Sequence, residues 1–272
     1  MSHYTVLVIG DNPEEQLEPF WELDLPKEDL IKDKRAVFEE SFKVEDLEKE
    51  FLKFKEKYKE DLEKGEQDYW LKYRTCSAKE WLENWSGDYL NNEETAYGYY
   101  ANPNSKWDWY SLGGRWTGAF KLKVDCEGKV GKPGLMTSPN EPGTCDQAKK
   151  GDIDFSPDKL KYNEAITFWE LKIEDRKPKN KTEQEMIECD WYKKEYYLKK
   201  FKTKENYAKL QAEFSTFAVL KDGEWYESGS MGWFGCNSAT PEEEGKFKEG
   251  FYDKFIKELP GDTLLSVYDC HI

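Results

Sequence analysis

The two ends of the chain carry its clearest β-strand patterns. Residues 3–9 read HYTVLVI, a β-branched apolar run long enough for a buried strand, and Gly10 and Asp11 interrupt it. Near the other end, the turn residues Pro260-Gly261-Asp262 precede a second apolar run, Leu264–Cys270. We therefore expect a fold whose sheet includes both termini.

Helical patterns lie between these two runs. The clearest predicted helix spans 41–64, where apolar residues recur at spacings of three and four among Lys and Glu: Val44, Leu47, Phe51, Phe54 and Tyr58. Asn12-Pro13 is typical of a helix start with Asn as the cap, and Ser77 and Glu80 form a capping box ahead of Trp81 and Trp85. Two further helices are predicted over 182–213 and 241–259.

Further strands are predicted over 116–124, over 162–173, and in a hairpin over 217–227 that turns at Asp222-Gly223. Residues 127–158 are rich in Gly and Pro and are predicted as a long loop. Together these elements predict a single α+β domain over 1–272, with a mostly antiparallel sheet and helices on one face. A ferredoxin-like core with a long helical insertion is one concrete version of this fold.

Composition excludes several classes of function. The chain has 272 residues, a net charge of −15 and 16% aromatic residues, so its surface repels phosphate backbones and its core is aromatic. General nucleic-acid binding is therefore not expected. Six scattered Cys and two His offer no zinc-ligand spacing, and no cofactor is expected. No segment resembles a signal peptide or a membrane span, which predicts a cytosolic protein with reduced thiols.

Two aromatic, glycine-containing segments resemble each other. The first glycine corner, Trp109–Gly118, reads WYSLGGRWTG, and the second glycine corner, Trp225–Gly235, reads WYESGSMGWFG. Glycines let a backbone approach a ligand closely, while Trp and Tyr offer flat faces. We interpret the two corners as strand–turn–strand units and as two candidate halves of one site; a chance likeness is the alternative.

The first corner and the residues before it hold one of only four arginines in the chain, Arg115. Its guanidinium suits a phosphate or carboxylate, and Asp108 suits an N–H or hydroxyl of a base or sugar. The candidate ligand-binding residues are Trp107, Asp108, Trp109, Tyr110, Gly113, Gly114, Arg115, Trp225, Tyr226 and Trp233. The alternative is that the aromatic residues are core and that Arg115 pairs with Asp108.

Catalytic motifs are lacking, so a non-catalytic protein is expected. If the terminal strands are neighbours, His3 lies near Cys270 and His271, and a Cys–His pair is a known nucleophile and base. Cys270 and His271 are adjacent on a strand and face opposite sides, so only His3 can partner either of them. A small hydrolase therefore stays an alternative.

The start MSHYTVLVIGDNPEEQL, the block NPNSKWDWYSLGGRW, the hairpin KDGEWYESGSMGWFG and the end DCHI resemble a group of tailed-bacteriophage and prophage proteins. This group has no established activity, so the resemblance implies no catalytic residue. It implies an accessory protein made in the cytoplasm of a bacterial host.

With that context, we expect a protein that binds and neutralises a host component in counter-defence. The preferred partner is a host-derived, nucleotide-like anionic small molecule. An acidic inhibitor that docks on a host defence or nucleic-acid-binding protein is the alternative, and an oligomer is compatible with either hypothesis.

Overall fold

The chain divides into two compact units, where the sequence predicts one domain. The computed structural model describes residues 2–65, 67–134, 140–188 and 190–272. Unit 1 contains the residues up to Trp21 and Lys106–Ile272, and unit 2 is Glu22–Ser105. Helices and strands are present together, so the predicted α+β class is confirmed, whereas a ferredoxin-like core is not confirmed.

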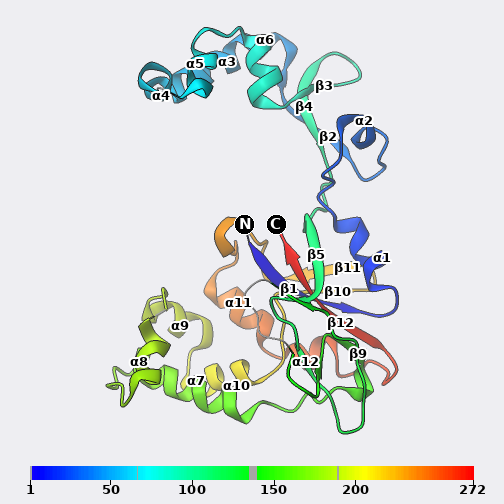
Figure 1. The fold of residues 1–272 in the computed structure, drawn as a ribbon, viewed down its shortest axis with the longest axis vertical. Helices are drawn as coiled ribbons and strands as arrows, with labels where there is room; N and C mark the ends of the chain where they lie inside the picture. The colour runs from blue at the N-terminus through cyan, green and yellow to red at the C-terminus, as the bar shows by residue number, and fades with distance from the viewer. Residues whose placement is uncertain (1, 66, 135–139, 189) are drawn as a thin grey trace. The chain divides into compact units, whose positions relative to one another are not determined.

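The sheet of unit 1 has the terminal strands at its centre. Its strands are β1 (His3–Ile9), β5 (Trp109–Gly114), β7 (Lys132–Pro133), β9 (Gln147–Lys149), β10 (Ala218–Lys221), β11 (Glu224–Glu227) and β12 (Leu264–His271). Their order is β11-β10-β1-β12-β5-β7, and β9 also pairs with β12. The pairs β1–β10 and β5–β7 are parallel, and the other pairs are antiparallel. β1 and β12 lie side by side, with the two chain ends next to each other (Figure 1).

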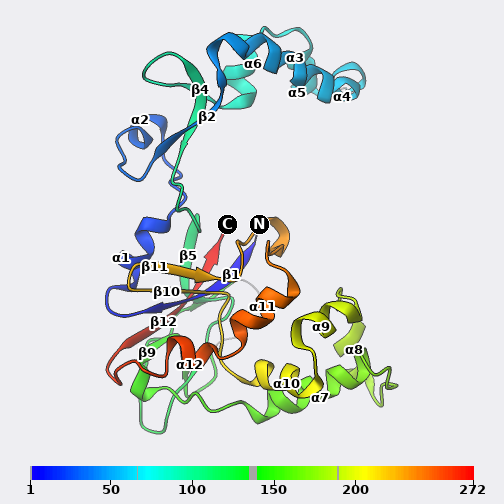
Figure 2. The same ribbon diagram turned by 180° about the vertical axis from the view of Figure 1, so that it is seen from behind.

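Alternation along the strands gives this sheet two covered faces. Leu7 and Val267 belong to a core that α12 completes with Phe251 and Phe255. Val6 and Tyr268 belong to the core on the opposite face, which includes Leu17 of α1 and Trp107. The view from behind shows α1 and α11–α12 on different sides of the strands (Figure 2). Helices thus cover both faces, not one.

The remaining elements of unit 1 are short or form a helical group. They are α1 (Pro13–Leu17), η1 (Glu18–Phe20), β6 (Phe120–Lys121), β8 (Thr144–Cys145), η4 (Lys150–Asp152), α7 (Lys159–Lys172), α8 (Lys181–Glu188), α9 (Lys194–Phe201), α10 (Lys204–Ala212), η5 (Trp233–Gly235), α11 (Pro241–Lys248) and α12 (Phe251–Phe255). α7, α9 and α10 share an aromatic core that includes Trp169, Tyr197 and Tyr207.

Several predicted elements of unit 1 are corrected. Residues 162–172 are part of helix α7 and Ile173 is its C-cap, so this segment is not a strand; the Asp158 side chain caps the backbone N–H groups of Leu160 and Lys161. The predicted helix 182–213 is three helices. The predicted helix 241–259 is two, because Gly250 adopts a left-handed φ of 69° between α11 and α12. The strand expected over 116–124 is reduced to β6.

Two local expectations are also refined. Asn12 precedes α1 but makes no side-chain cap, since it adopts a left-handed φ of 51°. The predicted loop 127–158 contains β7, β8, β9 and η4, while its residues 135–139 lie outside the described residues.

Unit 2 has its own sheet and its own aromatic core. It contains α2 (Lys27–Leu30), β2 (Val37–Lys43), η2 (Val44–Asp46), α3 (Leu47–Lys57), α4 (Lys59–Lys64), α5 (Asp68–Thr75), α6 (Ala78–Trp81), η3 (Leu82–Ser86), β3 (Tyr89–Leu90) and β4 (Ala96–Ala101). The strand order is β2-β4-β3. The predicted helix 41–64 begins only after β2 and is interrupted at Tyr58, whereas the capping box of Ser77 and Glu80 is confirmed. None of the helices in the described part of the chain is long and apolar enough to cross a membrane.

Candidate functional site

Polar side chains gather at one end of the unit 1 sheet. His3 pairs in register with His271, Thr5 pairs with Asp269, and His271 pairs in turn with Trp109 of β5. Because side chains alternate along a strand, these five residues share the sheet face that holds Leu7 and Val267 further along. We call the set His3, Thr5, Trp109, Asp269 and His271 the polar end of the sheet.

Each of the two histidines of the chain is held by a carboxylate. Nδ1 of His3 lies 2.8 Å from Oδ1 of Asp269, and Nδ1 of His271 lies 2.6 Å from Oδ1 of Asp108. A carboxylate only accepts hydrogen bonds, so Nδ1 of each ring donates and Nε2 is left as the second nitrogen. Among the residues that the structure describes, neither Nε2 has a hydrogen-bond partner. The sequence-based alternative of an Arg115–Asp108 pair is wrong, because Asp108 bonds His271.

The two imidazoles and the indole of Trp109 form one aromatic group. The ring centroids of His3 and His271 are 4.8 Å apart, and each lies 5.3 Å from that of Trp109. Trp109 stacks on His271 at an interplanar angle of 18° and remains 44% exposed. The polar end therefore presents a flat aromatic surface directly beside two oriented imidazoles.

The glycines of the first corner bring Arg115 to the polar end. Gly114 adopts a φ of 52°, and a Cβ at this position would lie 2.4 Å from Oδ2 of Asp269. This close approach lets the backbone N–H of Arg115 donate to Oδ2 of Asp269 at 2.9 Å. Asp269 is thus shared by His3 and Arg115, while the Arg115 side chain is exposed. The guanidinium has no hydrogen-bond or ion-pair partner among the residues described.

A second buried carboxylate fixes the loop that follows Arg115. Asp146 is fully buried and accepts from the backbone N–H groups of Gly118 and Gly131, at 2.6 and 2.8 Å, and from the Thr117 hydroxyl at 3.0 Å. Gly113, with a φ of 72°, leaves room for this carboxylate. Because its lone pairs are satisfied within the loop, we assign Asp146 a structural role.

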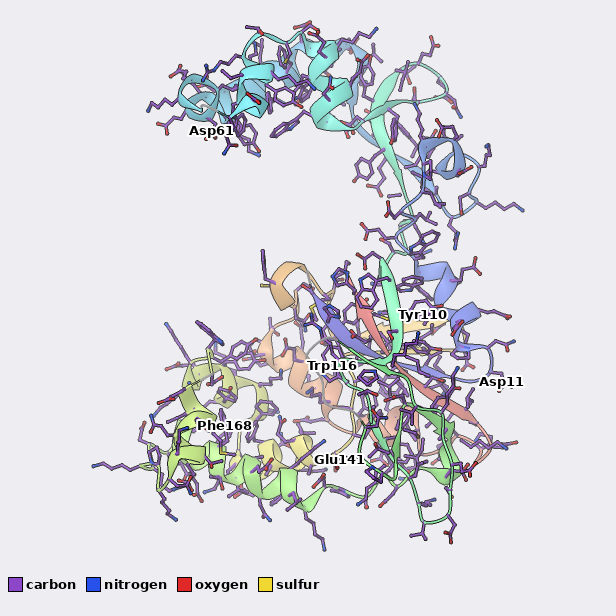
Figure 3. The ribbon with its side chains drawn as sticks, viewed as in Figure 1. Asp11, Asp61, Tyr110, Trp116, Glu141 and Phe168 are labelled. Carbon is purple, nitrogen blue, oxygen red and sulfur yellow. The ribbon has the colours of Figure 1, made fainter. Side chains whose placement is uncertain are left out.

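A cavity of about 390 Å³ opens beside the polar end, and both glycine corners line it. Trp116 comes from the first corner, and Ser228, Met231 and Gly235 come from the second. The second corner is held to the N-terminal strand by Ser2, whose Oγ accepts from the backbone N–H of Gly235 at 2.8 Å. Trp116, labelled in Figure 3, comes from the loop just beyond β5.

Thr5 connects the polar end with this cavity. It lines the cavity wall and pairs in register with Asp269. His3 lies two residues before Thr5 on the same strand face, a separation of about 7 Å. His3 does not itself line the cavity but lies next to Thr5 along the same strand face, and His271 pairs with His3 in register.

Two lysines and two tyrosines line the side of the cavity that α9 and α11 provide. Lys200 bonds the Glu244 carboxylate, which also accepts from the Tyr196 hydroxyl at 2.9 Å. Burial alone would raise the pKa of Glu244, but the hydrogen bond and the positive charge of Lys200 outweigh it and lower the pKa of this carboxyl group. Tyr192 stacks on Tyr196 with centroids 4.1 Å apart and is 52% exposed.

Lys248 is a second cation of this cavity, and unlike Lys200 it has no partner within the part of the chain that the structure describes. It lines the 390 Å³ hollow and also an adjoining one of similar volume that shares Thr5 and Trp116. Burial, and then the nearby positive charge of Lys200, lowers the pKa of Lys248 to about 8. No hydrogen bond or ion pair reaches its ammonium from the described residues. The negative charge of Glu244 offsets only part of this lowering, and an anion that entered the cavity would add a further counter-charge.

The structure separates the predicted site residues into two groups. Asp108, Trp109, Gly113, Gly114 and Arg115 come together at or beside the polar end, as described above. The others face the two apolar cores instead: Trp107, Tyr110, Trp225 and Tyr226.

Specific contacts hold these four residues in the cores, and Tyr226 packs against Phe255. Trp107 is 7% exposed and donates its Nε1–H to the carbonyl of Leu17. Tyr110 packs edge-on against Trp107, while Trp225 packs against Phe20. The core alternative is therefore correct for this group. The side chain of Trp233 lies outside the described residues.

The register of β1 against β12 contradicts the predicted Cys–His nucleophile and base. Cys270 is completely buried in the core with Tyr4 and Val6, on the sheet face opposite His3 as well as His271, so the expected His3–Cys270 pair does not form. Burial, and then the negative charges of Asp269 and Asp108, raises the pKa of the Cys270 thiol well above its ordinary value. A buried thiol that keeps its proton is not a nucleophile. Within the described residues, no group of three or more His, Cys, Asp or Glu side chains is arranged to hold a metal ion.

Lys200, Lys248, Thr5 and Tyr192 were not predicted as site residues. Lys248 lies inside the predicted helix 241–259, directly after Phe247, and its sequence neighbourhood, KFKEG, is like many others in this lysine-rich chain. One feature of the sequence bears on the pairing of His271 with Asp108. Asp108 lies in the block NPNSKWDWYSLGGRW and His271 in the end DCHI, and both segments carry the resemblance described above.

No protein-family model, no curated protein and no solved structure matches this chain. The candidate site therefore rests on its own geometry.

Proposed function

We propose that unit 1 binds a small, nucleotide-like anion in the cavity beside the polar end of the sheet. The observation that carries this proposal is Lys248, a largely buried ammonium without a partner among the described residues. An anionic group that paired with Lys248 would gain a charge-assisted hydrogen bond. Trp116 and Tyr192 would hold a flat ring system by stacking.

The exposed guanidinium of Arg115 supports a ligand with more than one anionic group. Arg115 immediately precedes Trp116, which lines the cavity, and its backbone is anchored on Asp269. A ligand that spans the cavity and its rim could meet Lys248 with one group and Arg115 with another. In this proposal the protein sequesters such a molecule in the cytoplasm of an infected bacterium, as a counter-defence protein.

Titration calorimetry with ATP, ADP, AMP and adenosine tests this proposal. We expect affinity to increase with phosphate number and adenosine to bind least. Lys248→Met should weaken ATP binding at least tenfold, since a hydrogen bond to a charged group contributes roughly 1.5–3 kcal/mol. Lys246→Met, an exposed lysine of the same helix, is the matched control. Equal affinity in both variants, or binding of none of the four compounds, would disprove the proposal.

Proton linkage gives a second readout of the same binding event. An anion that pairs with Lys248 favours the charged ammonium, so binding at pH 8.5 should take up a fraction of a proton from the buffer. Calorimetry in two buffers of different ionisation enthalpy measures this uptake. It should disappear in Lys248→Met and at pH 6, where the free lysine is already protonated.

Unit 2 supports a second candidate function, docking on a partner protein. Trp81 is 6% exposed, and its Nε1–H has no hydrogen-bond partner among the described residues. It lines a hollow of about 370 Å³ with Phe42, Phe54 and Trp85. A buried, unsatisfied donor beside a hollow lined by aromatic and charged side chains fits an extended partner segment that inserts an apolar side chain and brings a main-chain carbonyl to that donor.

Selection from a displayed peptide library, followed by titration of the selected peptide, tests the docking function. Trp81→Phe keeps an aromatic ring and removes the donor, so it should weaken binding about fivefold to tenfold. Trp191→Phe is the control, because Trp191 is 95% exposed and lies in unit 1. If no peptide is selected, or if both variants bind it equally, unit 2 does not dock in this way.

A further inference from the structure

The two histidines of the chain are 268 positions apart in sequence, yet their ring centroids lie 4.8 Å apart. His3 is bonded to Asp269 and His271 to Asp108, through Nδ1 in both cases. Each pair has the arrangement in which a carboxylate fixes the tautomer and the orientation of an imidazole. Nε2 of each ring is then the nitrogen that can accept or donate a proton.

The burial and the neighbours of the two imidazole rings are typical of a reaction site and not of a surface ion pair. The side chains of His3 and His271 are 10% and 7% exposed, so proton transfer there would occur with little competing water. The partly exposed indole of Trp109 contacts both rings. Arg115, an exposed cation, is joined through its backbone to Asp269, the carboxylate that orients His3.

We propose that His3 and His271 are a general acid–base pair that hydrolyses a phosphoester bond in the anionic ligand. This inference rests on the proposed binding function, because the cavity and Arg115 would hold the phosphoryl group next to the rings. It assigns a phosphodiester or other phosphate ester as the substrate class.

The chemical step balances with water as the only co-reactant. The neutral imidazole removes a proton at Nε2 from a water molecule, and the water oxygen attacks phosphorus. As the new P–O bond forms, the bond between phosphorus and the leaving oxygen breaks, and the imidazolium of the other histidine donates its Nε2 proton to that oxygen. The two rings have then exchanged protonation states, and proton exchange with solvent restores them. Arg115 would stabilise the charge on the remaining phosphoryl oxygens.

Turnover of bis(4-nitrophenyl) phosphate, 4-nitrophenyl phosphate, ATP and a cyclic dinucleotide tests the proposal. We expect the wild-type protein to hydrolyse at least one of these compounds. His3→Gln and His271→Gln should each reduce kcat about 100-fold or more, since positioned acid–base groups typically contribute roughly 10²–10⁴. Binding of the same compound, measured by calorimetry, should persist in both variants. Circular dichroism checks their folding, and if one variant does not fold, the other decides the result.

Asp108 and Asp269 are positioning residues in this proposal. Asp108→Asn keeps an oxygen that can accept from Nδ1 of His271 but removes the negative charge. This variant should lower kcat with little change in KM. If the Asp108–His271 bond only joined two strands, the substitution would not lower kcat selectively.

The outcomes separate this inference from the proposed function. Binding without turnover of any of the four compounds would overturn the inference and leave the binding function in place. Turnover that survives in both histidine variants would also overturn it. If neither binding nor turnover is found with the four compounds, both proposals fail.

Discussion

Nδ1 of His3 lies 2.8 Å from Oδ1 of Asp269, and the two residues are 266 positions apart in the chain. The antiparallel pairing of the first and last strands brings them together, because Thr5 faces Asp269 and His3 lies next along the same face. Asp269 also accepts from the backbone of Arg115. One buried carboxylate thus joins three distant segments at the end of the sheet.

Gly114 is expected to be required for this junction. Gly114→Ala would place a Cβ 2.4 Å from Asp269 at a left-handed φ of 52°. We expect it to lower the free energy of unfolding by about 2–4 kcal/mol, measured by urea denaturation. Gly223→Ala is the control, since it also has a left-handed φ, 77°, but has no atom within 4 Å of the added Cβ. It should cost only about 1 kcal/mol. Equal losses would show that the contact with Asp269 carries no energy.

Lys248 should make the folded protein less stable below pH 8 than it is above. Its pKa is about 8 in the folded state against an ordinary value of 10.5, so the unfolded chain binds more protons between these values and stability rises with pH. Lys248→Met removes this penalty. The variant should exceed the wild type in free energy of unfolding by up to about 3 kcal/mol at pH 7, and the difference should shrink towards pH 10.

Urea unfolding of both proteins at pH 7 and pH 10 measures this effect. Lys246→Met should show no such pH-dependent difference from the wild type. A Lys248→Met difference that stays constant across this range would contradict a depressed lysine pKa.

Cys270 should be unreactive in the folded protein. Its thiol is buried and its pKa is raised, whereas Cys236 is exposed. With a thiol reagent at pH 8, peptide mapping by mass spectrometry should find Cys236 labelled well before Cys270. Denaturation in urea should abolish the difference. Rapid labelling of Cys270 without unfolding would mean that the end of the sheet opens.

Thr240 should stabilise the helix that carries Lys248. Its hydroxyl accepts from the backbone N–H of Glu243, whose carboxylate accepts in return from the Thr240 backbone. Thr240→Ala should cost about 1 kcal/mol of unfolding free energy, measured by thermal or urea denaturation. Thr240→Ser retains the cap and should cost much less. Similar losses in the two variants would assign the effect to the lost methyl group and not to the cap.

Features that depend on interactions between near neighbours in the sequence could be predicted well. The capping box at Ser77 is predictable because a cap joins residues three apart, and it is present. The amphipathic pattern that starts at Val44 does correspond to a helix, α3. The first residues of the predicted range, 41–43, belong to β2 instead. Residues 162–173 were assigned to a strand because their many aromatic and β-branched residues favour strands. Packing of Trp169 and Ala165 against α10, together with the Asp158 cap, selects a helix there.

The sequence by itself determined the terminal strands, the α+β class and the aromatic block that contains Asp108, Trp109 and Arg115. It also placed a histidine near each end of the chain. Only the tertiary structure decided that these histidines pair with two carboxylates and that Trp107 and Tyr110 belong to the core. It alone decided that Lys248 lines a cavity without a partner from the described residues. The physical reason is that each of these facts depends on strand register and on which face a side chain occupies, and both are set by contacts between residues far apart in sequence.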